Sequence, residues 1–124
     1  MLLEEDLTSE IIAAAIDVHR ALGPGLLESV YEECLCRELQ LRGIVFERQV
    51  DLPIVYKGIR LREGFRIDIF VERRIVLELK AVDRVLPIHE AQLLTYLRLS
   101  KSRVGLLLNF NVVAMRHGVV RRVL

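Results

Sequence analysis

The chain has 124 residues and a mass of 14.3 kDa, the size of one ordinary domain, which buries about two-thirds of the surface of its unfolded chain. Its hydrophobic fraction of 52% is high, but no uninterrupted apolar run approaches the roughly 20 residues of a membrane helix. The acidic first segment lacks the basic start of a signal peptide. We therefore expect a single cytoplasmic domain over residues 1–124 that is neither exported nor inserted in a membrane.

The charges are distributed unevenly, although the net charge at pH 7 is only +1. Residues 1–40 hold nine acids and two bases, whereas residues 97–124 hold six bases and no acid. One interpretation is a basic surface for the phosphates of a nucleic acid, and the other is ion pairing with the acidic helices, within one subunit or across a dimer. The bases are Arg98, Lys101, Arg103, Arg116, Arg121 and Arg122.

The first two predicted elements are helices. Apolar residues recur at helical spacing from a cap at Thr8 to residue 22, where Gly23-Pro24-Gly25 ends the pattern. A second helix is predicted over residues 26–41, with Gly43 at its end. The side chains expected on its buried face are Leu27, Val30, Tyr31, Cys34, Leu35 and Leu39.

The two cysteines, Cys34 and Cys36, lie two positions apart in this helical pattern and so point to different sides of the helix. We expect buried or half-buried thiols and no disulfide. A zinc site needs about four ligands. The three histidines, His19, His89 and His117, are scattered without ligand spacing, which argues against such a site.

Strands are predicted next. Residues 44–82 are rich in Val, Ile, Phe and Tyr and are broken at 57–58, 63–64 and 72–74, which predicts a meander of three or four strands. Pro87 is placed to open a third helix that runs to residue 99. Residues 104–110 and 112–120 are predicted as two further strands. The element order predicts an α/β fold in which helices flank a mixed sheet.

The candidate chemistry lies in two of these strands. Asp68 stands between two isoleucines, and the sequence Leu77-Glu78-Leu79-Lys80 follows after a short turn. Alternate residues of a strand face the same side, so Glu78 and Lys80 project together, and a hairpin through residues 72–74 brings Asp68 near Glu78. Such hard oxygen ligands suit Mg²⁺ or Mn²⁺.

The alternative for these charges is a solvated sheet face with surface ion pairs, Glu78 with Lys80 or Asp68 with Arg66. Such pairs are common and have no chemical role. The spacing of the charges leaves both interpretations open.

A second motif adds a resemblance. The segment Gly25-Leu26-Leu27-Glu28-Ser29-Val30-Tyr31 has the form GxxExxY. Together with Asp68, Glu78, Lys80, Gln92 and Tyr96, it resembles the GxxExxY protein family over about residues 7–122. That family is assigned to the PD-(D/E)xK nuclease superfamily. The resemblance implies a restriction-endonuclease-like core and a metal-dependent nuclease that hydrolyses phosphodiester bonds, of DNA more than of RNA.

The resemblance also implies roles for single residues. Glu28, Asp68 and Glu78 would hold Mg²⁺ or Mn²⁺, and Lys80 would be the catalytic lysine. Ile67 stands where the superfamily name has proline, a position that supplies no chemistry.

Three further residues are candidates for supporting roles. Gln92 and Tyr96 resemble a QxxxY element and would contact substrate, or else they bond to each other or to the backbone. Tyr31 lies one turn beyond Glu28 and either orients that carboxylate or packs in the core with its hydroxyl satisfied.

Two other classes of function fit the same fold. The chain would then be a non-catalytic module that binds nucleic acid or protein, or a small subunit of a larger complex. A homodimer would let two sites face two strands. A purely binding module has no chemical need for Asp68, Glu78 and Lys80 together, which favours the enzyme.

Overall fold

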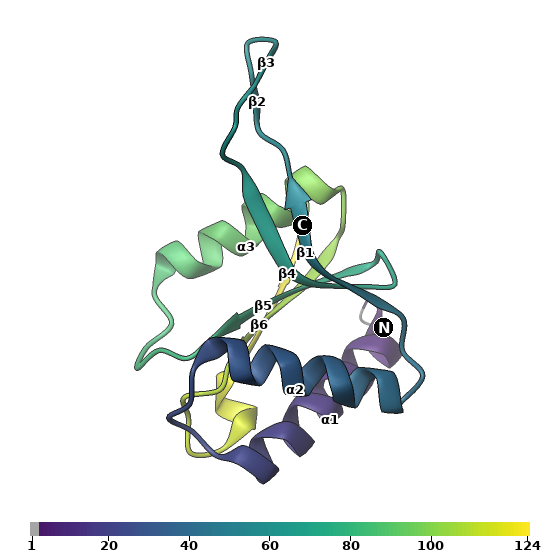
Figure 1. Cartoon of the computed structure of the whole chain (residues 1–124), viewed down its shortest axis with the longest axis vertical. Helices are drawn as coiled ribbons and strands as arrows, with labels where there is room; N and C mark the ends of the chain where they lie inside the picture. The colour runs from purple at the N-terminus through teal and green to yellow at the C-terminus, as the bar shows by residue number, and fades with distance from the viewer. Residues whose placement is uncertain (1–2) are drawn as a thin grey trace.

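A computed structural model describes residues 3–124 (Figure 1). A five-stranded mixed sheet has the strand order β1-β4-β5-β6-β7, and β2 and β3 form a separate hairpin. The predicted α/β fold with helices flanking a mixed sheet is confirmed. The helices are α1 (Glu5–Leu22), α2 (Glu28–Leu41) and α3 (Pro87–Ser100), and the strands are β1 (Phe46–Leu52), β2 (Val55–Tyr56), β3 (Ile59–Arg60), β4 (Phe65–Val71), β5 (Ile75–Lys80), β6 (Val104–Asn109) and β7 (Val119–Val123).

Both N-terminal helices start at other residues than the sequence predicts. Helix α1 begins at Glu5, so Thr8 is inside the helix instead of capping it, and its hydroxyl donates to the Glu4 carbonyl at 2.9 Å. Helix α2 begins at Glu28, and the preceding Leu27 has an extended backbone and a side chain that is 73% exposed. The expectation that Leu27 and Val30 face inward is therefore wrong. The face of α2 that packs on the core is the one that carries Tyr31 and Leu35.

The last predicted strand is also shifted. Residues 112–118 form bends and a short 3₁₀ helix, η1 (Met115–Gly118), and β7 starts only at Val119. The reason is the antiparallel pairing of β6 with β7, since the chain must reverse direction after Asn109. Gly118 closes this reversal against the Asn109 carbonyl oxygen, which an added Cβ would approach to 2.0 Å.

The sheet separates two cores. Helices α1 and α2 cover one face and α3 covers the other (Figure 1). Strand β4 takes part in both, because Ile69 and Val71 pack with the α1–α2 core whereas Phe65 and Ile67 pack with the α3 core. The strand therefore twists sharply at Asp68, between two fully buried isoleucines.

The same twist is present in β1, where Gln49 lies opposite Asp68. Arg48 and Ile69 pair on one side of this point and Val50 and Ile67 on the other, but Gln49 itself leaves the regular pairing. Its φ is 50°, in the left-handed region that residues other than glycine rarely adopt. Beyond this point β1 and β4 continue as a two-stranded ribbon that has left the main sheet.

The charge distribution has a definite structural outcome. The acids of α1 and α2 pair with Arg42 and Arg48. Among residues 3–124, no ion pair joins the C-terminal bases to these helices, and Arg122 contacts Glu90 of α3 instead. Pairing with the acidic helices within one subunit is therefore wrong.

The cysteines are free thiols, as expected, and burial raises the pKa of Cys36 to about 11. In the described part of the chain, no helix combines the length and the apolar composition that crossing a membrane requires.

Candidate functional site

Asp68 and Glu78 lie opposite each other at the point where β4 separates from β5. The regular backbone pairing of these strands ends at Ile69 and Leu77. At the next position the Asp68 N–H donates to the Glu78 carboxylate at 3.2 Å, and the Leu79 N–H donates to the Asp68 carboxylate at 2.9 Å. The two carboxylates thus take the place of backbone carbonyls as hydrogen-bond acceptors, and the predicted hairpin brings them side by side.

Both carboxyl groups resist ionisation in this place. Glu78 is only 6% exposed, and burial raises its pKa to about 9, with a further contribution from the negative charge of Asp68. Burial also raises the pKa of Asp68, while the hydrogen bond from Leu79 opposes that rise. Two neighbouring carboxylates with raised pKa values are typical of a site that a cation completes.

Lys80 and Glu28 lie at the edge of this pair. Lys80 is half-buried at the end of β5, and its positive charge lowers the pKa values of Asp68 and Glu78. Glu28 is the first residue of α2 and is exposed. Its pKa is raised by desolvation, lowered by Lys80 and raised by Asp68, so its carboxylate is within electrostatic reach of the other three groups.

The surface ion pairs that the sequence left open are absent from these positions in residues 3–124. Glu78 is buried and has no ion pair with Lys80, and Arg66 pairs with Asp51 at 3.1 Å instead of with Asp68. The alternative of surface ion pairs is therefore wrong for both carboxylates, and a solvated position is wrong for Glu78.

Helix α3 brings Tyr96 to the opposite side of the pair. Its ring packs against Phe65 with a centroid distance of 5.1 Å. Burial raises the pKa of Tyr96 to about 12, and the negative charges of Glu78 and Asp68 add to the effect. Gln92, one turn earlier, is half-buried, and within the described residues its amide has no hydrogen-bond partner.

Tyr31 belongs to the core and not to the charged group. It is fully buried and stacks on Phe110 with ring centroids 4.6 Å apart. Its hydroxyl donates to the Gly23 carbonyl at 2.6 Å and accepts from the Leu26 N–H at 3.1 Å. Tyr31 therefore packs in the core with its hydroxyl satisfied and does not contact the Glu28 carboxylate. It holds the glycine loop that precedes Glu28.

Two residues beside the carboxylates were missed by the sequence interpretation. Glu32 is 8% exposed on α2 and accepts hydrogen bonds from Arg48 at 2.8 Å and from the Gln49 amide at 2.8 Å. A hydrogen bond from Gln49 also opposes the rise in the pKa of Asp68. The sequence contains a signal for the position of Glu32, because this residue lies four positions after Glu28 and therefore on the same helix face. Gln49 had none.

The donor set suits a hard divalent cation. Asp68 and Glu78 offer carboxylate oxygens, the ligands that Mg²⁺ and Mn²⁺ prefer. Each carboxylate accepts from one backbone N–H, which leaves further lone pairs on its oxygens for a cation. As positioned, no three His, Cys, Asp or Glu side chains in residues 3–124 form a closed metal cluster. A buried and a half-buried carboxylate with an exposed third acid nearby fit an open site that includes water and substrate oxygens.

The comparison with protein families agrees with this geometry. A family model described as the PD-(D/E)XK nuclease superfamily matches residues 5–123, nearly the whole chain. Comparison with curated proteins and with solved structures gave no match. Proteins of this superfamily generally use divalent metals and act on nucleic acid, which suggests a nuclease. The site where β4 separates from β5 and the match over residues 5–123 lead to one conclusion: the chain belongs to the PD-(D/E)XK nuclease superfamily.

Proposed function

We propose that this protein is a metal-dependent nuclease that hydrolyses phosphodiester bonds, of DNA in preference to RNA. The observation that carries the proposal is the hydrogen-bonded pair of carboxylates, buried Glu78 and half-buried Asp68, with Lys80 beside them. A structural ion pair would not need two adjacent acids that repel each other and raise each other's pKa. The GxxExxY motif supports assignment to the GxxExxY family within the superfamily.

Asp68 and Glu78 hold one or two Mg²⁺ or Mn²⁺ ions in this proposal, and Glu28 adds its carboxylate from the start of α2. A bound divalent cation lowers the pKa of water and polarises the phosphoryl group. Glu28 lies at the positive end of the helix dipole, which favours its charged form. Its exposed side chain makes no hydrogen bond or ion pair within residues 3–124 that would hold it away from Asp68 and Glu78.

Lys80 acts on the nucleophile and on the developing charge. Its ammonium group is held at the end of β5, on the same face as Glu78. A positive charge at this place positions the attacking water and stabilises the negative charge that builds up on the phosphoryl oxygens. Because the charge of Lys80 opposes the rise in the pKa values of Asp68 and Glu78, it favours the ionised forms that a metal ion needs.

Tyr96 of α3 lies within reach of the charges of Glu78 and Asp68, and with Gln92, one turn earlier on the same helix, it is the proposed substrate contact. The half-buried Gln92 amide donates to a phosphate oxygen, and Tyr96 limits the space beside the carboxylates. Tyr31 supports the site indirectly through the loop before Glu28. A homodimer belongs to the same proposal, since two centres would act on two strands. A solution mass near twice 14.3 kDa supports it and a mass of 14.3 kDa contradicts it.

The test is cleavage of labelled single- and double-stranded DNA and RNA with Mg²⁺ or Mn²⁺. Wild type is compared with Lys80→Ala and Glu78→Ala, all purified identically. The proposal predicts metal-dependent cutting that both variants lose. A contaminating nuclease would survive both substitutions. Intact substrate with all three proteins, together with retained affinity for nucleic acid, would instead identify a binding module.

A further inference from the structure

The ribbon of β1 and β4 ends in a projecting hairpin, which we define as the arm, residues 53–64 (Figure 1). Strands β2 and β3 pair only with each other. Their turn is Lys57-Gly58, with φ values of 49° and 80°, as in the type I′ turn that matches the natural twist of a hairpin. A two-stranded hairpin alone is marginally stable in water. The arm therefore has the form of an element that extends toward a partner.

The side chains of the arm are available to such a partner. Val55 and Tyr56 are each 63% exposed, and Ile59 is 66% exposed. The arm carries three bases, Lys57, Arg60 and Arg62, and one acid. None of the ion pairs among residues 3–124 includes these three bases, and all three are exposed. Six other arginines of the chain do pair with acids, whereas the positive charges of the arm are not neutralised by a neighbouring acid.

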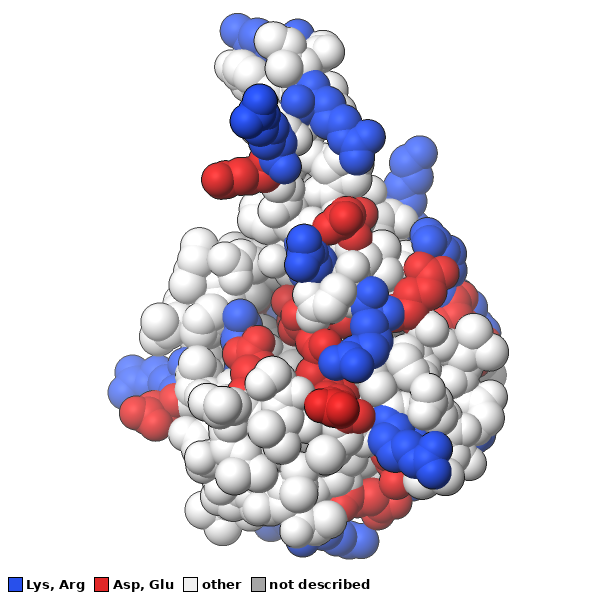
Figure 2. Space-filling view, in the orientation of Figure 1, with Lys and Arg blue, Asp and Glu red and all other residues white. Residues whose placement is uncertain are grey.

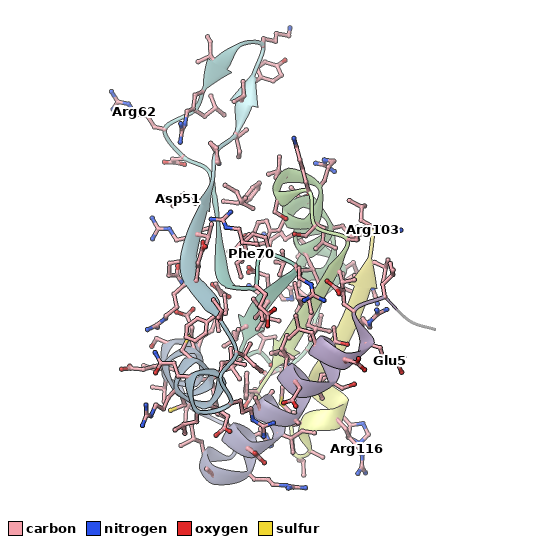
Figure 3. All side chains as sticks on the ribbon, turned by 90° about the vertical axis from the view of Figure 1, so that its right-hand side faces the viewer. Glu5, Asp51, Arg62, Phe70, Arg103 and Arg116 are labelled. Atoms are coloured by element: carbon pink, nitrogen blue, oxygen red, sulfur yellow. The ribbon has the colours of Figure 1, made fainter. Side chains whose placement is uncertain are left out.

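The base of the arm forms a cleft of about 510 Å³. Arg60, Arg62 and Arg66 line it together with Gly64. An added Cβ on Gly64 would come within 2.6 Å of the Leu52 carbonyl oxygen, so glycine permits the two chains to approach closely here. Figure 3 shows Asp51 at this junction and Arg62 extending from the arm. The close approach holds the arm in one direction relative to β1 and β4.

The arm leads directly into β4, the strand that carries Asp68 (Figure 1). Figure 2 shows Lys and Arg side chains over the arm and, below it, acidic side chains gathered in the middle of the same face. Arg62 lies six residues before Asp68, just ahead of the start of β4 at Phe65, so their Cα atoms are at most about 20 Å apart. Bases in one strand of DNA follow each other at about 3.4 Å. A strand held at Asp68 would therefore reach the arm roughly six nucleotides away.

We propose that the arm binds the sugar-phosphate backbone of the nucleic acid several nucleotides from the point of cleavage, without reading the sequence. This inference rests on the proposed function and adds a second contact to it. Unpaired Lys and Arg side chains on an exposed ribbon match the phosphates in charge and position the duplex without reading bases. Tyr56, whose ring lies 5.3 Å from the Lys57 ammonium, adds a surface for an unstacked base at the tip.

The test compares two triple substitutions that remove the same charge. Lys57→Gln, Arg60→Gln and Arg62→Gln are combined in the arm variant. Arg98→Gln, Arg103→Gln and Arg116→Gln are combined in the control, whose bases are also exposed. Figure 3 shows Arg103 and Arg116 on the side away from Arg62. Binding of a fluorescent 30-base-pair duplex is measured by anisotropy in EDTA between 50 and 200 mM salt, conditions that separate phosphate contacts from other contacts.

The arm variant is expected to bind at least about 10-fold more weakly, with the slope of log K against log salt reduced by about 2 to 3. The control removes three of the C-terminal bases that were the other candidate surface for phosphates, and the inference expects this variant to match the wild type. Equal binding by the arm variant, loss of binding in the control alone, or no binding by the wild type would each overturn the inference. So would a change of the arm variant to a smaller solution mass, which would identify the arm as a contact between two copies of the chain.

The failure of this inference and the failure of the nuclease proposal are separate outcomes. Hydrolysis of bis(p-nitrophenyl) phosphate by wild type and Lys80→Ala reports on the carboxylate centre alone, because this diester is too small to reach the arm. If hydrolysis depends on Lys80 but the arm variant binds duplex normally, the proposed role of the arm is contradicted while the proposed nuclease activity is supported.

Discussion

Asp68 and Glu78 each lie within hydrogen-bond reach of the other's strand: the Asp68 N–H donates to the Glu78 carboxylate, and the Asp68 carboxylate accepts from the N–H that follows Glu78. These bonds replace the backbone ladder at the point where β4 and β5 separate. Where the two strands separate, the carboxylates of Asp68 and Glu78 supply the hydrogen bonds that the backbone no longer makes, and this brings the two side chains together. The fold and the charged centre thus have the same structural cause.

The metal-free protein should lose stability as the pH rises. The pKa of Glu78 is about 9 in the folded state against an ordinary 4.5, so between these values the folded state holds a proton that the unfolded state has released. This contribution is complete below about pH 4.5 and is lost as the pH rises through about 9, with a slope of at most about 1.4 kcal/mol per pH unit. Urea unfolding in EDTA at pH 5 to 9 measures it. Glu78→Gln, which carries no titrating proton there, should flatten the slope, and an unchanged slope would contradict this assignment.

Divalent cations should stabilise the fold. At pH 8, Mg²⁺ or Mn²⁺ at ten times its dissociation constant adds about 1.4 kcal/mol to the free energy of unfolding, which corresponds to several degrees in melting temperature. Asp68→Asn keeps the size of the side chain but removes its charge, so this variant should show a smaller rise or none. Differential scanning calorimetry with and without the metal gives both values. Equal rises in both proteins would place the cation elsewhere.

Gln49 should be more tolerant of glycine than of alanine. Its φ of 50° strains any side chain with a Cβ, and glycine removes that strain, while both substitutions remove the amide that bonds to Glu32. Gln49→Gly is therefore expected to be about 1 kcal/mol more stable than Gln49→Ala. Urea unfolding of the two variants measures the difference. Alanine as the more stable substitution would argue against a strained strand at this point.

Tyr31→Phe should remove the hydrogen bonds that hold the loop before α2 without creating a cavity in the core. The ring and its stacking on Phe110 remain, but the Gly23 carbonyl and the Leu26 N–H lose their shared hydroxyl partner. The expected loss is about 1 to 3 kcal/mol in the free energy of unfolding. If the loop positions Glu28, nuclease activity should fall in the same variant under conditions where it is fully folded. Full activity there would limit Tyr31 to stability.

The positions of Asp68 and Glu78 in the site could be predicted from the local sequence pattern. A carboxylate between two apolar residues, a short turn and a second carboxylate at the matching register bring Asp68 and Glu78 together once the hairpin forms. Glu32 was predictable from its helical spacing to Glu28. Gln49 was not, because a left-handed residue inside a strand has no local sequence signal. Its conformation follows from the twist that carries β1 and β4 from one core to the other.

The errors at element ends have a similar origin. Residues 112–118 are apolar enough for a strand, but the antiparallel return to β6 requires a reversal there, where an added Cβ at Gly118 would clash with the Asn109 carbonyl oxygen. Thr8 has the side chain of a cap, yet a helix that starts three residues earlier places it in the interior of α1. Local propensity indicates that an element exists, whereas tertiary packing decides where it begins.

The central claim is that Asp68 and Glu78 together hold a divalent cation. Isothermal titration of Mn²⁺ into wild type and Asp68→Asn at pH 7.5, in two buffers with different ionisation enthalpies, tests it most directly. Because the pKa of Glu78 is raised to about 9, cation binding must release a proton, so the heat for the wild type should depend on the buffer. Asp68→Asn should bind much more weakly. No heat from the wild type, or equal binding by the variant, would contradict the claim.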